Sequence, residues 1–158
     1  MDYRLALIPP EGGSYALIFR CNHPRRVQIG KLGTVVTEPG YYVYCGTAFG
    51  SGGLRARIGR HLTLRRNKHW HIDYLRPFLK LERIWYSRAP HNLEHRWSDR
   101  LLDIAFVSGA AVLPLARFGA SDCRCPTHLV RLPFRPDLQS LRFTEEGEPG
   151  VVEISWNT

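Results

Sequence analysis

The sequence lacks the features of membrane and secreted proteins. No apolar run approaches the ~18 residues that a membrane span requires. The first residues carry an early acid, Asp2, and only a short apolar run before Pro9, which predicts that no signal peptide is present. Cysteine is scarce and is limited to Cys21, Cys45, Cys123 and Cys125. Four cysteines without secretory context favour reduced thiols over a disulfide framework, so we expect a cytoplasmic protein with no membrane partner.

Repeats, low-complexity tracts and linkers are also missing, which excludes fibrous, collagen-like and wholly disordered chains. The 158 residues are 44 % hydrophobic and 23 % charged, as in soluble globular proteins. At this length, folding buries about 70 % of the surface of the unfolded chain. We therefore expect one domain over residues 1–158, with a core that needs neither metals nor disulfides.

Lysine is rare, because 19 of the 22 basic residues are arginine, and the net charge is +8. Acids are absent between Glu38 and Asp73, a stretch that contains Arg55, Arg57 and Lys68. Arginine binds phosphate through a planar fork, and a basic face attracts nucleic acid in a salt-dependent way. The distribution favours a nucleic-acid partner, for which we expect DNA more than RNA. A GC-rich genome or a heat-adapted host is the alternative source of the arginine.

Hydrophobic patterning predicts the strands. They are expected at residues 3–8, 14–21, 27–29, 32–36, 41–45, 81–86 and 128–134. A glycine-rich loop follows at 46–53, the region 119–126 is predicted to be a loop, and the tail from Glu145 is expected to be loosely attached.

Helical spacing predicts three helices. Leu54, Ile58 and Leu62 recur every four residues and predict a helix over 53–63. A shorter helix is expected over 71–78, and a third begins near Asn92, a favourable N-cap residue.

Three polar residues flank the apolar faces of these helices. At about 100° per residue, Arg57 and His61 lie beside the apolar stripe of the first helix, whereas Arg60 points elsewhere. Glu94 lies at the rim of the stripe of the third helix. Taken singly, Arg57 is typical of a solvated charge, and Glu94 of an acid that the helix dipole favours in a first turn. Together they can face one cleft.

These residues, with two triplets, carry a resemblance to a known family. Gly13-Ser14-Tyr15 lies on one predicted strand and Tyr44-Cys45-Gly46 ends another, ahead of the helices with Arg57, His61 and Glu94. This order resembles the GIY-YIG endonuclease superfamily over residues 13–104. With the patterning, it implies an α/β (α+β) fold, in which helices flank a mixed, mainly antiparallel central sheet. Residues 105–158 would then be an extension packed on the same domain.

Two further segments narrow the resemblance. HWHIDYL (69–75) and FGASDCRCPTHL (118–129) are most similar to a basic, single-domain branch of the superfamily that is catalogued only as a domain of unknown function. The chain departs from the superfamily pattern in two respects. The triplets are 28 residues apart, which predicts an enlarged hairpin over residues 22–40, and Ser14 and Cys45 replace the isoleucines of the family name. Surface hairpins tolerate such insertions, and we expect both replaced positions to be packing residues, Cys45 as a small buried hydrophobe.

The resemblance implies divalent-metal-dependent hydrolysis of phosphodiester bonds, leaving 5′-phosphate and 3′-hydroxyl ends. The implied catalytic residues are Tyr15, Tyr44, Arg57, His61 and Glu94. Glu94 would bind the ion, Mg²⁺ in preference to Mn²⁺, and Arg57 would stabilise charge on the phosphate. Tyr15 would position or deprotonate the attacking water, with support from Tyr44. A tyrosine with a pKa near ~10 is a poor base, so either metal or arginine must lower that pKa or His61 must share the proton.

Other residues are candidates for substrate contact. They are Gly46, Arg55, Lys68, His69 and His71. Asp73 is expected to start a helix or form a salt bridge, with a second metal carboxylate as the less favoured role. If exposed, Tyr41, Tyr42 and Trp70 would stack unpaired bases, although the four tryptophans are expected mainly in the core or at its rim.

Two other functions stay open from the sequence. One is a noncatalytic nucleic-acid-binding module, which would not need a carboxylate at the rim of a basic groove. The other is a zinc-stabilised interaction protein built on Cys123, Cys125 and His128, a spacing that leaves a fourth ligand unassigned. As an enzyme, the chain would have weak sequence specificity, recognise a DNA structure, or depend on a partner protein for specificity.

Overall fold

A five-stranded antiparallel sheet forms the centre of the protein, in the order β6-β4-β1-β5-β7. The computed structural model describes residues 2–63, 67–109, 117–118, 127–141 and 150–156. The strands of this sheet are β1 (Ser14–Cys21), β4 (Gly40–Thr47), β5 (Lys80–Ser87), β6 (Leu129–Leu132) and β7 (Val152–Ser155). A separate hairpin is formed by β2 (Arg25–Ile29) and β3 (Gly33–Thr37). The α+β class and the enlarged hairpin between the two motif strands are confirmed.

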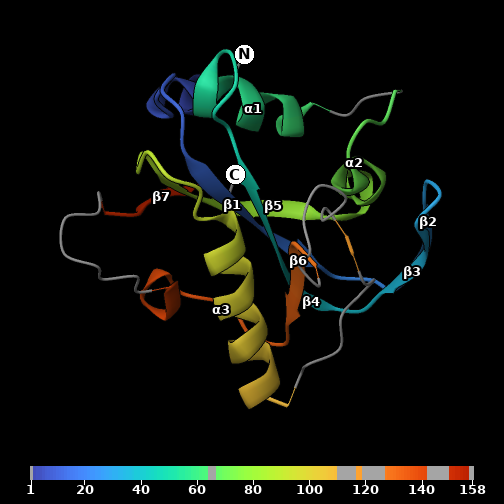
Figure 1. Ribbon diagram of the computed structural model, residues 1–158. Helices are drawn as coiled ribbons and strands as arrows, with labels where there is room; N and C mark the ends of the chain where they lie inside the picture. Colours follow the sequence, from blue (N-terminus) through green and yellow to red (C-terminus); the bar gives the residue numbers. More distant parts are fainter. Residues whose placement is uncertain (1, 64–66, 110–116, 119–126, 142–149, 157–158) are drawn as a thin grey trace.

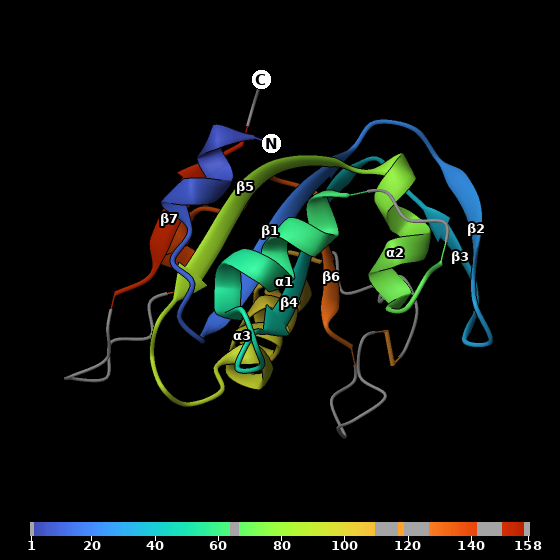
Figure 2. The same ribbon diagram turned by 90° about the horizontal axis from the view of Figure 1, so that it is seen from above.

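Helices cover both faces of the sheet. They are α1 (Gly53–Leu62), α2 (His71–Leu75) and α3 (Glu94–Val107), with 3₁₀ turns η1 (Tyr3–Leu7), η2 (Arg76–Phe78) and η3 (Leu138–Leu141). Figures 1 and 2 show α1 and α2 over one face and α3 over the opposite face. No helix among the described segments is both long and apolar enough to cross a membrane.

Strand β1 lies in the middle of the sheet because it is apolar on both sides. Tyr15, Leu17 and Phe19 belong to the core beneath α1 and α2. Ala16 and Ile18 belong to the core beneath α3. A strand that is buried on both faces has a continuous run of apolar residues. Strand β1 pairs with β4 on one side and with β5 on the other.

Helix α1 begins with two glycines in the left-handed region, Gly52 (φ 83°) and Gly53 (φ 62°). A Cβ atom at Gly53 would lie 2.0 Å from the carbonyl oxygen of Pro10, so the start of α1 packs directly on the backbone that precedes β1. Leu54 and Ile58 form the predicted buried stripe. This arrangement places the last turn of α1, with His61, above the first residues of β1.

The predictions for the two ends of the chain are wrong. The strand predicted over 3–8 is instead the 3₁₀ turn η1 (Tyr3–Leu7), because the Asp2 side chain accepts a hydrogen bond from the Arg4 backbone and pairs with its guanidinium. The tail is not loosely attached at Val152–Ser155, which forms strand β7 against β5. Residues 145–149 lie outside the described residues.

Smaller differences concern the ends of elements. The predicted helix over 71–78 is α2 followed by the 3₁₀ turn η2, and the strand over 128–134 is limited to β6. The N-cap residue of α3 is Leu93, not Asn92. The Asn92 side chain still supports this helix start, because its Oδ1 accepts a hydrogen bond from the Glu94 backbone N–H at 2.8 Å.

Candidate functional site

A buried tyrosine–histidine pair lies at the start of β1. The Tyr15 hydroxyl is 2.7 Å from His61 Nε2, and the two side chains are 1 % and 2 % exposed. Tyr15 comes from the second residue of β1, and His61 comes from the last turn of α1 above it. The tertiary packing of α1 on the sheet therefore joins residues that are 46 positions apart in the sequence.

Gly46 leaves the space that this pair occupies. It is the register partner of Tyr15 on β4, and a Cβ atom there would lie 2.5 Å from the Tyr15 hydroxyl oxygen. No side chain fits at that distance without displacing the hydroxyl. The structure thus gives Gly46 a steric role in the site, whereas the sequence predicted substrate contact.

Aromatic rings surround the His61 imidazole. Its centroid lies 5.8 Å from the Tyr44 ring and 5.1 Å from the Trp70 ring. Tyr44 in turn contacts Phe118 edge to face at 6.2 Å. Arg76 fixes the backbone here, since its Nε donates to the His61 carbonyl oxygen at 2.9 Å. The imidazole is held in one place by packing rather than by flexible surface contacts.

Arg57 and Glu94 act electrostatically on the two tyrosines. Burial is the main cause that raises the pKa of Tyr15 well above its usual value. The nearby Arg57 opposes this rise, and Glu94 adds to it. The pKa of Tyr44 is raised in the same way, first by burial and then by Glu94. The guanidinium carbon of Arg57 lies 4.8 Å from the Trp70 ring, so this side chain also belongs to the cluster.

Burial also keeps His61 neutral. It lowers the pKa of His61 from 6.5 to about 4, with Asp73 opposing the shift and Arg57 adding to it. Arg57 alone does not lower the pKa of Tyr15 below its usual value, because the rise caused by burial outweighs it. The neutral imidazole beside the Tyr15 hydroxyl fits the option in which His61 shares the proton.

Glu94 lies in a group that can hold a metal ion. One ligand atom from each of Glu94, His95 and His128 lies within 4.8 Å of the other two. The Glu94 Oε1 and His128 Nδ1 atoms are 2.8 Å apart, and the side chains are 13 % and 4 % exposed. His95 Nε2 lies 3.8 Å from the same oxygen and is 47 % exposed. One carboxylate oxygen and two imidazole nitrogens are common donors for divalent metals, so the residues fit such an ion.

Ser14 connects this group to β1. Its hydroxyl oxygen accepts a hydrogen bond from the Leu93 backbone N–H at 2.9 Å, directly before Glu94. The position predicted to be only a packing residue therefore fixes the start of α3 next to the start of β1. Cys45 is a fully buried thiol, as expected, and burial raises its pKa to about 12.

The remaining candidates for substrate contact differ in their surroundings. The Arg55 guanidinium donates to the backbone oxygens of Ile8 (2.7 Å) and Ala6 (3.3 Å), so it supports the N-terminal segment. Lys68 is exposed, with its ammonium 5.8 Å from the Tyr74 ring. His69 is also exposed and lies edge-on to Trp70 at 5.2 Å. His71 is half-buried against Phe118 at 5.5 Å.

Asp73 has the predicted role at a helix start. Its Oδ2 accepts hydrogen bonds from the backbone N–H groups of His69 (2.8 Å) and Trp70 (2.9 Å) ahead of α2. Tyr42 is buried, which argues against base stacking on it, whereas Tyr41 and Trp70 are partly exposed. Trp85, Trp97 and Trp156 are buried, as predicted.

Sequence reasoning missed His95 and Arg76, and it assigned His128 to a different site. His95 adjoins Glu94, so a search for metal-ligand types around that acid would have found it. His128 was considered with Cys123 and Cys125, which lie outside the described residues, and the structure places it against Glu94 instead. Nothing in the local sequence connects His128 to a helix that begins 34 positions earlier.

Comparisons with known proteins give a family without an activity. No curated protein and no solved structure matches the chain. One family profile, described as "Domain of unknown function DUF123", matches residues 14–145. This match spans β1 to the region beyond β6 and includes every residue of the site described above. The protein belongs to the DUF123 family.

Proposed function

We propose that the protein is a divalent-metal-dependent endonuclease of the GIY-YIG type that hydrolyses phosphodiester bonds of DNA. The observation that carries the proposal is the buried 2.7 Å contact between the Tyr15 hydroxyl and His61 Nε2. Tyr44 packs on the same imidazole, and Arg57 and Glu94 act on both tyrosines. The whole implied catalytic set thus gathers at the adjoining ends of β1, β4, α1 and α3.

Proton transfer in this proposal uses Tyr15 and His61 as a unit. Burial lowers the pKa of His61 to about 4, so the imidazole is neutral near pH 7, and its Nε2 takes the Tyr15 proton only as the attacking water transfers its own proton to the Tyr15 oxygen. The Tyr15 hydroxyl donates to that nitrogen and receives a proton from the attacking water in return. Tyr15 therefore does not have to exist as a free phenolate, which its burial strongly disfavours.

Arg57 and the acidic group act on the phosphate. Arg57 donates hydrogen bonds to the non-bridging oxygens as their negative charge grows. Glu94, with His95 and His128 beside it, would hold the divalent ion, which supplies positive charge for the leaving oxygen. Mg²⁺ prefers oxygen ligands and keeps several waters, whereas imidazole favours transition ions. We therefore expect Mn²⁺ to be a better activator than Mg²⁺.

The central experiment compares the native protein with Glu94→Ala on labelled single-stranded, duplex and branched DNA and on RNA, in Mg²⁺, Mn²⁺ or chelator. Asp99→Ala is the control, because Asp99 is an exposed acid on the same helix. We expect cleavage by the native and Asp99→Ala proteins and its loss in Glu94→Ala and in chelator. Salt-dependent binding with no cleavage by the native protein would replace the proposal with the noncatalytic binding module. Equal cleavage by native and Glu94→Ala proteins would overturn the assigned ligand.

Two tyrosine-to-phenylalanine variants distinguish a catalytic role of a hydroxyl group from a role in stability. Tyr15→Phe removes the hydroxyl next to His61, and we expect a loss of cleavage of about 10²–10⁴-fold, as for a lost acid–base group. Tyr42→Phe is the matched control, since its buried ring lies on β4 and its hydroxyl contacts only the backbone of Glu38 among the described residues. We expect Tyr42→Phe to lower stability with cleavage retained. Equal losses of cleavage in both variants would contradict a chemical role for Tyr15.

A further inference from the structure

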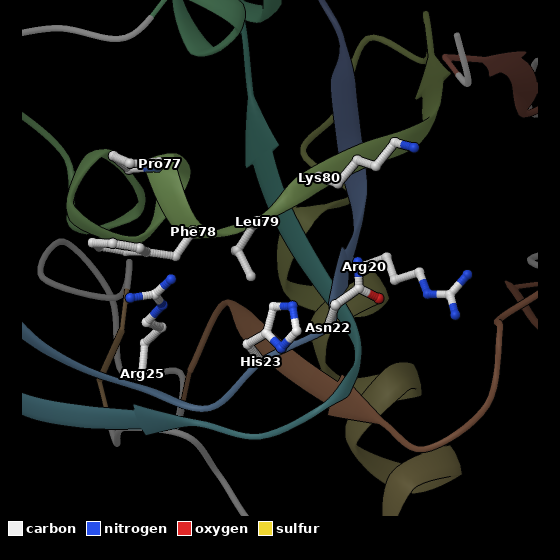
Figure 3. Close-up of a pocket in the computed structure, with 8 residues that line it drawn as sticks. All are labelled: Arg20, Asn22, His23, Arg25, Pro77, Phe78, Leu79 and Lys80. Carbon is white, nitrogen blue, oxygen red and sulfur yellow. The ribbon is translucent and has the colours of Figure 1, made fainter.

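A second basic surface lies at the end of β1 that is distant from the Tyr15–His61 pair. A pocket of about 260 Å³ lies between the end of β1, the connection to β2, the turn η2 and the start of β5. Figure 3 shows His23 between Arg25 and Arg20 in this view, with Lys80 on the neighbouring strand. No carboxylate is among the described side chains that line this pocket. Its chemistry therefore suits an anion.

Two of these cations stand opposite each other. Arg20 and Lys80 are register partners of the antiparallel β1–β5 pair, so their side chains leave the same face of the sheet. Like charges in this position repel each other and lower stability. Two other strand arginines have acidic partners, since Arg83 binds Glu153 at 2.9 Å and Arg131 lies 3.8 Å from Glu38. Within the described residues, no ion pair involves Arg20 or Lys80, so an anion bound there would relieve a repulsion that folding leaves in place.

The other lining residues add donors without cancelling the charge. The Arg25 guanidinium carbon lies 5.7 Å from the Phe78 ring, a contact that positions the cation but does not neutralise it. Asn22 contributes an amide and His23 an imidazole. Guanidinium, ammonium and amide groups are the donors that proteins use for phosphate oxygens. The volume is below the ~300–1,000 Å³ of pockets for drug-sized ligands, which suits one phosphate group rather than a whole cofactor.

We infer that this pocket binds a backbone phosphate of the nucleic acid that the candidate site acts on. The inference rests on the nucleic-acid partner of the proposed function, but not on hydrolysis. Arg20 lies five residues from Tyr15 on β1, about 17 Å at ~3.3 Å per residue, and its side chain leaves the face of the sheet on which Ala16 and Ile18 lie, opposite to that of Tyr15. A nucleic acid that contacts both places therefore has to pass around the edge of the sheet. The net charge of +8 and the lack of a carboxylate among the described lining residues favour nucleic acid over an acidic protein segment.

The test measures DNA binding as a function of salt in the Glu94→Ala background, in which the probe stays intact. The probe is a labelled duplex of about two helical turns, and anisotropy is followed from about 0.05 to 0.2 M salt. The pocket variant is Arg20→Gln with Lys80→Gln. The control, Arg100→Gln with Arg135→Gln, removes the same charge from exposed positions outside the pocket.

For the pocket variant we expect the slope of log K against log salt to become shallower by about 1, because the one phosphate contact that is lost contributes about 0.9. The control is expected to keep the native slope. The free pocket variant should also melt no lower than the native protein, because the Arg20–Lys80 repulsion is gone. Equal slopes for both variants would overturn the inference.

Amide NMR spectra identify the source of the anion. A single-stranded oligodeoxynucleotide is expected to shift the amide signals of Asn22, His23 and Lys80. If inorganic phosphate shifts them and the oligonucleotide does not, the assignment to nucleic acid is overturned, as it is if polyglutamate binds there and DNA does not. Absent cleavage with these shifts intact would contradict only the proposed endonuclease activity.

Discussion

At the residue scale, the central feature is a neutral imidazole buried against a neutral phenol. His61 has a pKa of about 4 in the folded protein and about 6.5 when unfolded, with burial as the main cause. The unfolded chain therefore binds more protons between pH 6.5 and pH 4, and the folded state loses stability as the pH falls through this range. The shift corresponds to about 3 kcal/mol at full extent.

His61→Gln is expected to remove most of this pH dependence, because glutamine has no titrating ring. Urea unfolding at pH 7 and near pH 4.5 measures the difference, with exposed His69→Gln as the control. A pH dependence in His61→Gln as large as in the native protein would contradict the burial argument.

A second prediction at the residue scale concerns the stability of a Gly46 variant. In Gly46→Ala the new methyl group would lie 2.5 Å from the Tyr15 hydroxyl oxygen, so the ring must move away from His61. We expect a loss of about 1–3 kcal/mol of unfolding free energy, typical of overpacking. Gly50→Ala is the control, since a Cβ atom there meets nothing within 4 Å. Equal urea midpoints for the two variants would show that the site has spare room.

At the scale of elements, strand β7 completes the sheet through one acid. Glu153 Oε2 accepts a hydrogen bond from the Trp85 indole N–H at 2.7 Å, and its Oε1 pairs with Arg83 at 2.9 Å. Trp85 is fully buried, so Glu153→Ala would leave its N–H without this acceptor. We expect a loss of about 1–3 kcal/mol in urea unfolding. Glu11→Ala, at an exposed acid, is expected to change little, and a similarly small effect of Glu153→Ala would contradict this role.

The local sequence pattern was sufficient to predict some strands and helices correctly, but not others. Strand β1 and helix α1 were predicted within a residue or so, because a two-faced apolar run and a four-residue apolar spacing each match one backbone geometry. Residues 3–8 also have a strand-like composition, but the cap formed by Asp2 and Arg4 favours a 3₁₀ turn. Strand β7 is mostly exposed at the edge of the sheet, so its stability comes from pairing with β5 and from the contacts of Glu153 rather than from a buried apolar face.

At the scale of the whole molecule, a metal ion would connect parts of the fold that are distant in sequence. Glu94 and His95 start α3, whereas His128 directly precedes β6. An ion that binds only the folded arrangement stabilises it, by about 2.7 kcal/mol at one hundred times the dissociation constant.

We expect Mn²⁺ to raise the melting temperature of the native protein and of Asp99→Ala, with a smaller rise in Mg²⁺. Glu94→Ala and His128→Ala are expected to lose this rise, which thermal melts with and without chelator measure. An undiminished rise in Glu94→Ala would place the ion elsewhere.

The sequence by itself determined the residue types of the site and the faces on which they lie. Helical periodicity put Arg57, His61 and Glu94 beside apolar stripes, because burial of a stripe fixes which side chains flank it. The tertiary structure alone decided which of these groups meet. The contacts of His61 with Tyr15 and of His128 with Glu94 join segments far apart in the chain, and they depend on how helices pack on the sheet. Burial within that packing also set the direction of the pKa shifts, which no local spacing encodes.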